Sequence, residues 1–241
     1  MAFAKRDEGK KVNSNINVIP MVDVMLVLLI IFMVITPMLQ KGRSVDLAKT
    51  NNPIQMPDAD KEDALLVAVT RDNRIFFGND VVNDPGTLTD KVRDRLQNKT
   101  DKRVFIKADA RAPFRAVEQA LRAAHEVFFE SAVLLTEQTQ PGAEGPIVPP
   151  QGLEVRLGLA SSPATVVEMH NSGRPIPAVK VNDREIPWQA LQNALEQAFQ
   201  NQNEKLVVVE ADGSLPFAQI LRVIDLSRSV TAQIAVSLTG L

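Results

Sequence analysis

The 241-residue chain contains no cysteine, which excludes disulfide bonds and thiolate metal sites. Only two histidines are present, His125 and His170, and neither has the spacing of a metal-binding or nucleophilic motif. A glycine-rich phosphate loop is also missing. With 27 basic and 29 acidic residues the formal net charge is -2, so a nucleic-acid binder is not expected. The absences predict a protein that is not an enzyme and uses neither a metal nor a cofactor.

An apolar segment near the N-terminus is long enough to cross a bilayer once. Residues 20–39 hold a single ionisable side chain, and a helix of about 20 residues spans about 30 Å, the thickness of the hydrocarbon core. Pro20 suits the first helical turn, because its missing N–H would be unpaired there. A cleaved signal peptide fits less well, since the apolar run is too long and lacks a clean cleavage site. Because slightly more basic residues precede the segment than follow it, we predict a cytoplasmic N-terminus at residues 1–17 and a transmembrane helix over 18–39.

Asp23 is the only ionisable side chain between Lys11 and Lys41. An acid at the centre of a membrane helix costs about 2.5–3.5 kcal/mol and usually has a function. The alternative is that Asp23 lies in the first turn, near the headgroups, where a carboxylate simply favours the positive end of the helix dipole. Position in the sequence does not separate the two interpretations.

The helical face around Asp23 is apolar. Val27, Ile30 and Val34 follow Asp23 at helical spacings of four, seven and eleven residues, so they share its face and are predicted to pack against a partner helix. A single helix cannot enclose a water path for a proton. If Asp23 takes up and releases protons, the chain needs a partner with several membrane helices.

Residues 16–34, INVIPMVDVMLVLLIIFMV, resemble the signature of the ExbD/TolR biopolymer-transport family. The resemblance rests on Asn17, Pro20, Asp23 and the apolar tail, whereas Ile19 stands where ExbD-like members often carry threonine. It implies that Asp23 carries the proton and that Asn17 and Pro20 form the helix entry. It also implies that two copies of the helix, from a dimer of this chain, lie inside a pentamer of ExbB/TolQ-type subunits.

The resemblance further implies where the protein works and what it drives. The expected location is the bacterial inner membrane, with the bulk of the chain in the periplasm. The expected function is a motor subunit that uses the proton motive force to act on a TonB-like or other periplasmic client in biopolymer or receptor-mediated transport. The alternative is a passive membrane-anchored scaffold or binding protein without the proton cycle. A flagellar stator subunit fits poorly, because no OmpA-like motif is found in the C-terminal half.

The remainder of the chain contains an internal repeat at an offset of 103 residues. We predict a periplasmic linker at 40–61, a first domain at 62–139, a linker rich in Pro and Gly at 140–162 and a second domain at 163–241. The repeated landmarks are Asn79-Asp80 with Asn182-Asp183, Ala108-Asp109 with Ala211-Asp212, Pro113-Phe114 with Pro216-Phe217, and Ala132-Val133 with Ala235-Val236.

Each half is predicted to contain two short strands, a helix, a strand, a second helix and a final strand. In the first half the strands fall near 65–69, 74–77, 103–107 and 132–136. The predicted product is two α+β domains, each a mixed sheet with two helices on one face, and the second is expected to fold alone. The second copy could add a binding surface, extend the reach of the chain, or pair with the first copy within one chain.

Overall fold

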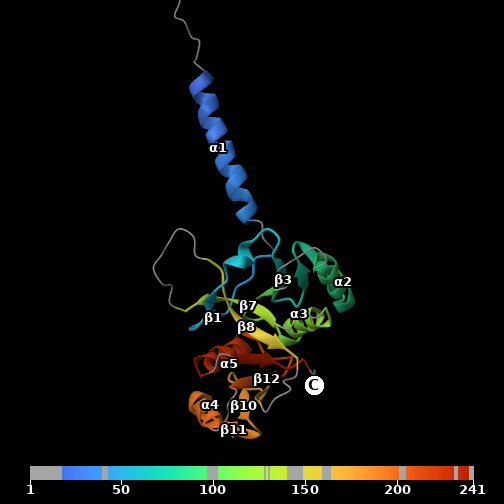
Figure 1. Ribbon diagram of the computed structural model, residues 1–241, viewed down its shortest axis with the longest axis vertical. Helices are drawn as coiled ribbons and strands as arrows, with labels where there is room; N and C mark the ends of the chain where they lie inside the picture. Colours follow the sequence, from blue (N-terminus) through green and yellow to red (C-terminus); the bar gives the residue numbers. More distant parts are fainter. Residues whose placement is uncertain are drawn as a thin grey trace, which may run out of the picture. The chain divides into compact units, whose positions relative to one another are not determined.

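The computed structural model describes residues 18–39, 43–96, 103–127, 129, 131–139, 149–158, 164–200, 205–230 and 233–238. The chain divides into two compact units, residues 1–40 and residues 41–241 (Figure 1). The first unit holds helix α1 (Val18–Leu39), which has 22 residues. Among the residues that the structure describes, no helix has both the length and the hydropathy required for a membrane span.

The second unit contains two similar successions of strands and helices. The first half comprises β3 (Leu65–Val69), β4 (Ile75–Phe77), β5 (Asp80–Val82), α2 (Pro85–Leu96), β6 (Val104–Ala108), α3 (Phe114–Glu126) and β7 (Ser131–Gln138). The second half comprises β8 (Gln151–Leu157), β9 (Thr165–His170), β10 (Ala178–Val181), β11 (Arg184–Ile186), the short helix η2 (Trp188–Ala190), α4 (Leu191–Phe199), β12 (Leu206–Ala211), α5 (Phe217–Val230) and β13 (Gln233–Val236).

All these strands belong to one sheet, in the order β11-β10-β9-β12-β13-β8-β7-β6-β3-β4-β5. In the first half β3, β6 and β7 run parallel, and in the second half β9, β12 and β13 do, whereas the strands of each outer hairpin run antiparallel. The joint is β8, which pairs antiparallel with β7 and parallel with β13 (yellow in Figure 1). The prediction of a separate sheet in each domain is therefore wrong, and the copies pair within one chain.

Strand β8 lies inside residues 140–162, which were predicted to be a linker. Leu153, Val155 and Leu157 are buried and alternate with the exposed Glu154 and Arg156, which is the period of a strand with one covered face. The preceding proline and glycine residues obscure this short pattern. Residues 140–162 therefore connect the two halves and also supply the strand that joins their sheets.

One hydrophobic core runs beneath both halves. It includes the apolar faces of α2, α3, α4 and α5 together with inward residues of the sheet from both copies. Equivalent apolar stripes of α3 and α5 are fully or almost fully buried: Phe114, Val117 and Leu121 in the first half, and Phe217, Ile220 and Ile224 in the second. Smaller clusters lie apart from this core, around Phe105 and Val133 in the first half and around Val208 in the second. A core that spans the repeat predicts a single folding unit.

The segment predicted as a periplasmic linker also contributes to the folded unit. It contains strand β1 (Lys49–Thr50), strand β2 (Ile54–Gln55) and the short helix η1 (Pro57–Asp60). β1 pairs with the end of β7 and β2 pairs with the start of β8. We call residues 46–56 the strap.

Candidate functional site

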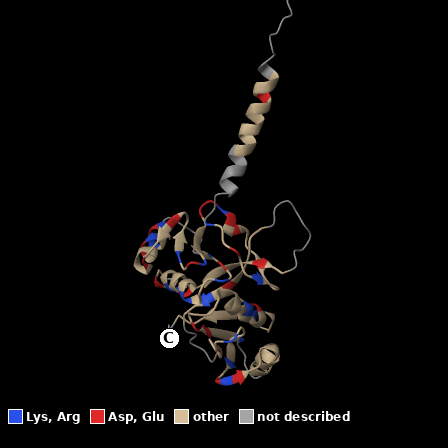
Figure 2. Cartoon of the chain, turned by 180° about the vertical axis from the view of Figure 1, so that it is seen from behind, with Lys and Arg blue, Asp and Glu red and all other residues tan. Residues whose placement is uncertain are grey.

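Asp23 lies beyond the first turn of α1. The helix begins at Val18, so Asp23 is its sixth residue, and the first turn contains no acidic side chain. Pro20 lies in that first turn, where the sequence places it. Figure 2 shows the red of an acidic side chain within the otherwise tan part of α1. Because the helix dipole acts mainly within the first turn, this position weakens the alternative in which Asp23 only favours the helix end.

The side chains of α1 that the structure describes, residues 20–32, are all exposed. Val27 is 49% exposed and Ile30 is 58% exposed, on the face that carries Asp23. Within the described part of the chain, Asp23 has no hydrogen bond or ion pair. The side chain of Val34 and the whole of Asn17 lie outside the described residues. The described residues thus leave the face around Asp23 uncovered.

The two copies cap each other's helices through a reciprocal set of hydrogen bonds. The Phe114 N–H at the start of α3 donates to the Leu215 carbonyl oxygen at 2.8 Å. The Phe217 N–H at the start of α5 donates to the Ala112 carbonyl oxygen, also at 2.8 Å. A second pair repeats the pattern at 2.9 Å, from Arg115 to Gly213 and from Ala218 to Ala110. The first N–H groups of a helix have no partner within it, so each copy satisfies the other's helix start.

This arrangement explains the repeated Ala-Asp and Pro-Phe landmarks. The two donors, Phe114 and Phe217, are 103 positions apart, and so are the two acceptors, Ala112 and Leu215, so the hydrogen bonds join equivalent positions of the two copies. Pro113 and Pro216 face each other in an antiparallel bridge at the centre. The contact is therefore isologous in the manner of a two-fold dimer, although both sides belong to one chain.

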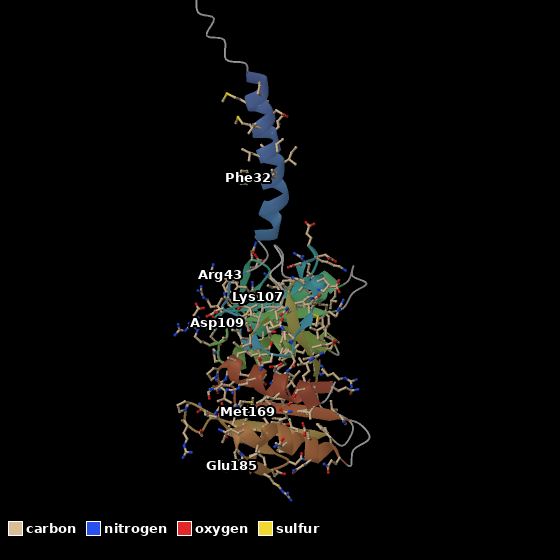
Figure 3. All side chains as sticks on the ribbon, turned by 90° about the vertical axis from the view of Figure 1, so that its left-hand side faces the viewer. Phe32, Arg43, Lys107, Asp109, Met169 and Glu185 are labelled. Atoms are coloured by element: carbon tan, nitrogen blue, oxygen red, sulfur yellow. The ribbon has the colours of Figure 1, made fainter. Side chains whose placement is uncertain are left out.

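The two aspartates of the landmarks shape the loops that supply these carbonyl groups. Asp109 accepts the Arg111 N–H at 2.9 Å, and Asp212 accepts the Ser214 N–H at 2.8 Å. Each is also tied to a neighbouring strand of its own half, since the Asp109 N–H donates to Val69 of β3 and the Asp212 N–H donates to Met169 of β9, both at 2.9 Å. Figure 3 labels Asp109 and Met169, which belong to different halves.

Hydrogen bonding lowers the pKa of both aspartates. For Asp109, burial alone would raise the pKa, but hydrogen bonds from the Arg111 backbone and guanidinium, with the nearby positive charge, hold it below its ordinary value of 3.8. For Asp212, hydrogen bonds from the Ser214 backbone and side chain lower the pKa in the same way, against a smaller effect of burial. Both loops are therefore most stable with the carboxylate ionised.

We expect Asp109→Asn to destabilise the folded unit by about 1 kcal/mol at pH 7, because asparagine preserves the turn but loses the charge-assisted bonds. A lowered folded pKa means that the stabilisation is present above the ordinary value of 3.8 and is lost as the pH falls through the folded pKa. The difference in the free energy of unfolding between Asp109→Asn and the native chain should therefore shrink below about pH 4. Urea unfolding of residues 43–241 at pH 7 and pH 3 measures it.

Asp90→Asn is the control, because Asp90 lies on the exposed face of α2 and pairs only with Arg93 among the described residues. It should change stability by less than about 0.5 kcal/mol at either pH. If Asp109→Asn lowered the free energy of unfolding by the same amount at both pH values, the stabilising role of the carboxylate charge would be contradicted.

The strap contacts both copies. Its Ala48 carbonyl oxygen accepts the Glu137 N–H at 3.0 Å, and the Thr50 hydroxyl donates to the Thr136 hydroxyl at 2.9 Å, both in the first half. Further along, the backbone N–H groups of Asn51 and Asn52 donate to the carboxylate of Asp225, on α5 of the second half. The strap thus lies where the two halves meet.

Sequence reasoning did not single out Asp225, Asn51 or Asn52. One signal was present, because Asp225 directly follows the core residue Ile224 and is a charged side chain on the apolar face of α5. At the offset of 103 the first copy carries Arg122, so the repeat itself gave no reason to select this position.

The family of the chain follows from comparison with known proteins. A family model described as biopolymer transport protein ExbD/TolR matches residues 9–139 and again residues 143–238. The chain therefore belongs to the ExbD/TolR family of non-enzymatic, inner-membrane transport proteins, and the double match agrees with a tandem duplication.

Two relatives show how much of the chain one copy accounts for. The chain is 33% identical over 145 residues to the Tol-Pal system protein TolR of Pseudomonas aeruginosa, a match that covers 99% of that protein and 56% of this chain. It is 34% identical over 126 residues to the biopolymer transport protein ExbD of Escherichia coli, covering 86% of that protein and 52% of this chain. No solved structure matches the chain.

Proposed function

We propose that this chain is the proton-using subunit of an inner-membrane motor driven by the proton motive force, with Asp23 as the residue that takes up and releases the proton. Membership of the ExbD/TolR family supports a role in energy transduction. The observation that carries the assignment to Asp23 is its place as the sixth residue of α1, beyond the first turn, in an apolar segment with no other ionisable side chain.

In this proposal α1 crosses the inner membrane, with the N-terminus in the cytoplasm and residues 41–241 in the periplasm. The apolar length of residues 20–39 and the inner-membrane location of the family support the crossing, and the slight excess of basic residues before the segment supports the orientation. Each elementary charge that moves through 100 mV supplies about 2.3 kcal/mol. This energy shifts a conformational equilibrium about fifty-fold, which is enough to drive a repeated change in the folded unit.

The proposed partner is a multi-span protein of the ExbB/TolQ type, a pentamer of which would surround two copies of α1. Val27 and Ile30 are exposed on the face of Asp23, so they are available to pack against its helices, and we assign Val34 to the same face. Asn17 and Pro20 would form the cytoplasmic entry of the helix. The proposed client is a TonB-like or TolA-like periplasmic protein.

Co-purification tests this assignment. We expect the tagged chain, extracted from native membranes, to carry a multi-span subunit that native mass spectrometry detects in a complex of fixed stoichiometry. The matched control is a chain reduced to residues 41–241, which keeps the second compact unit but should lose the multi-span subunit. A stable complex of the full chain that contains no other membrane subunit would contradict the motor and favour a passive scaffold.

A further inference from the structure

Asp225 is a buried acid whose side-chain hydrogen bonds with the described residues all lead to the strap. Its side chain is 4% exposed. One carboxylate oxygen accepts the Asn51 N–H at 2.7 Å, and the other accepts the Asn52 N–H at 2.9 Å and the Asn52 side-chain amide at 3.3 Å. Among the residues that the structure describes, no cation pairs with Asp225.

A carboxylate in such a position is costly unless donors surround it. Burial without hydrogen bonds would leave an uncompensated charge, which is among the most destabilising changes in a protein interior. Here the strap supplies the compensation with two backbone N–H groups, which carry no charge of their own. The docked strap and the Asp225 side chain therefore stabilise each other.

The first copy does not provide an equivalent. The position that corresponds to Asp225 is Arg122, which is 46% exposed and pairs with Glu118 one turn earlier on the same helix. Arginine cannot accept a hydrogen bond from a backbone N–H. Holding the strap through its amide groups is therefore a property of the second copy.

Further contacts flank this point on both sides. Before it, the Thr50 hydroxyl donates to Thr136 at the end of β7. After it, Ile54 pairs with Gly152 of β8, and the Met56 N–H donates to the Pro150 carbonyl oxygen at 2.6 Å. Asp225 thus holds the middle of a segment whose two ends are paired to different strands of the shared sheet.

We propose that the second copy serves as a clamp for the segment that follows α1, with Asp225 as its positioning residue. The clamp fixes Asn51 and Asn52 against α5, so a pull along the chain from α1 that passes the contacts of Asp46 and Ala48 with the first half reaches the second copy before it reaches η1. The docking of the strap is supported by the hydrogen bonds to Asp225, whereas the transmission of a pull from α1 rests on the proposed function.

Hydrogen exchange of the purified complex tests the clamp. In Asp225→Asn one oxygen is replaced by an amide group that donates instead of accepting, so we expect exchange at the Asn51 and Asn52 amides to become about tenfold faster or more. Exchange in β6 and β12 should stay unchanged. Asp90→Asn is the matched control, an acid-to-amide change on the exposed face of α2 that should leave the strap protected. Unchanged protection of Asn51 and Asn52 in Asp225→Asn would overturn the clamp.

A second variant covers the case in which Asp225→Asn loosens the whole fold. Asn51→Pro removes one donor without altering α5, and the preceding Thr50 is already in a strand, the conformation that proline favours before it. We expect faster exchange at Asn52 in this variant, and unchanged exchange there would also overturn the clamp. These hydrogen-exchange measurements do not depend on proton uptake or release by Asp23. If Asp23→Asn retained activity while the exchange results held, the motor would fail and the clamp would stand.

Discussion

Asp23→Asn should abolish client activity while leaving insertion and assembly intact. Asparagine has the shape of aspartate and still forms hydrogen bonds, but it cannot take up or release a proton. Asp23→Glu keeps a carboxyl group on a longer side chain, so we expect it to retain part of the activity. The measurement is client activity in cells at matched membrane levels of the complex.

The passive alternative predicts the opposite result. If Asp23 only favoured the end of the helix, asparagine would serve nearly as well, because it is itself a good cap and the lost dipole interaction is about 0.3–1 kcal/mol. An Asn variant with activity close to that of the native chain would rule out the proton-carrying role and favour the scaffold.

The repeat alone indicates that the second domain folds by itself, but the shared sheet and core now lead us to expect no cooperative unfolding transition for residues 163–241 expressed alone, although they contain a nearly complete copy of the repeat. The fragment lacks β8, so the inner edge of β13 would be unpaired. It also lacks the carbonyl groups of Ala112 and Ala110 that accept the first N–H groups of α5. Because the hydrophobic core continues into the first half, the cut would expose apolar surface that the intact chain buries.

Thermal unfolding followed by circular dichroism compares this fragment with residues 43–241, which should unfold in one cooperative transition. A fragment of residues 149–241 is the intermediate control, since it regains β8 but still lacks the first copy. A cooperative transition in residues 163–241 with the helix content of a folded domain would show that the second copy has a sufficient core of its own.

Local structure in the first half followed closely from the sequence, except that strand β5 was not predicted. The strand predicted at 65–69 is β3, and those predicted at 103–107 and 132–136 overlap β6 and β7. Pro113 and Pro216 directly precede α3 and α5, as the placement of proline before a helix indicates. These features depend on residues close together in the chain, which is why a single sequence is enough to find them.

The reciprocal capping between the two copies depends on residues that lie far apart in the sequence. The repeat showed that the Pro-Phe and Ala-Asp landmarks matter, but the hydrogen bond from Phe114 to Leu215 links residues about 100 positions apart, and no local pattern encodes that pairing. The same holds for Asp225, whose partners lie at the opposite end of the folded unit in sequence. Asp23 differs, because its setting is one local helix and its resemblance to a known family lies in the same residues.

The reciprocal capping has a consequence for how the chain can change. In a dimer of identical chains, a substitution on one side of a two-fold contact occurs on the other side as well, so the two sides cannot specialise. Joining the two sides in one polypeptide removes this constraint, because each half has its own codon at every position. Arg122 and Asp225 occupy corresponding positions with opposite charges and different partners. The duplication therefore allows an asymmetric unit to form around a symmetric contact, and the backbone N–H groups of Asn51 and Asn52 dock on the second half.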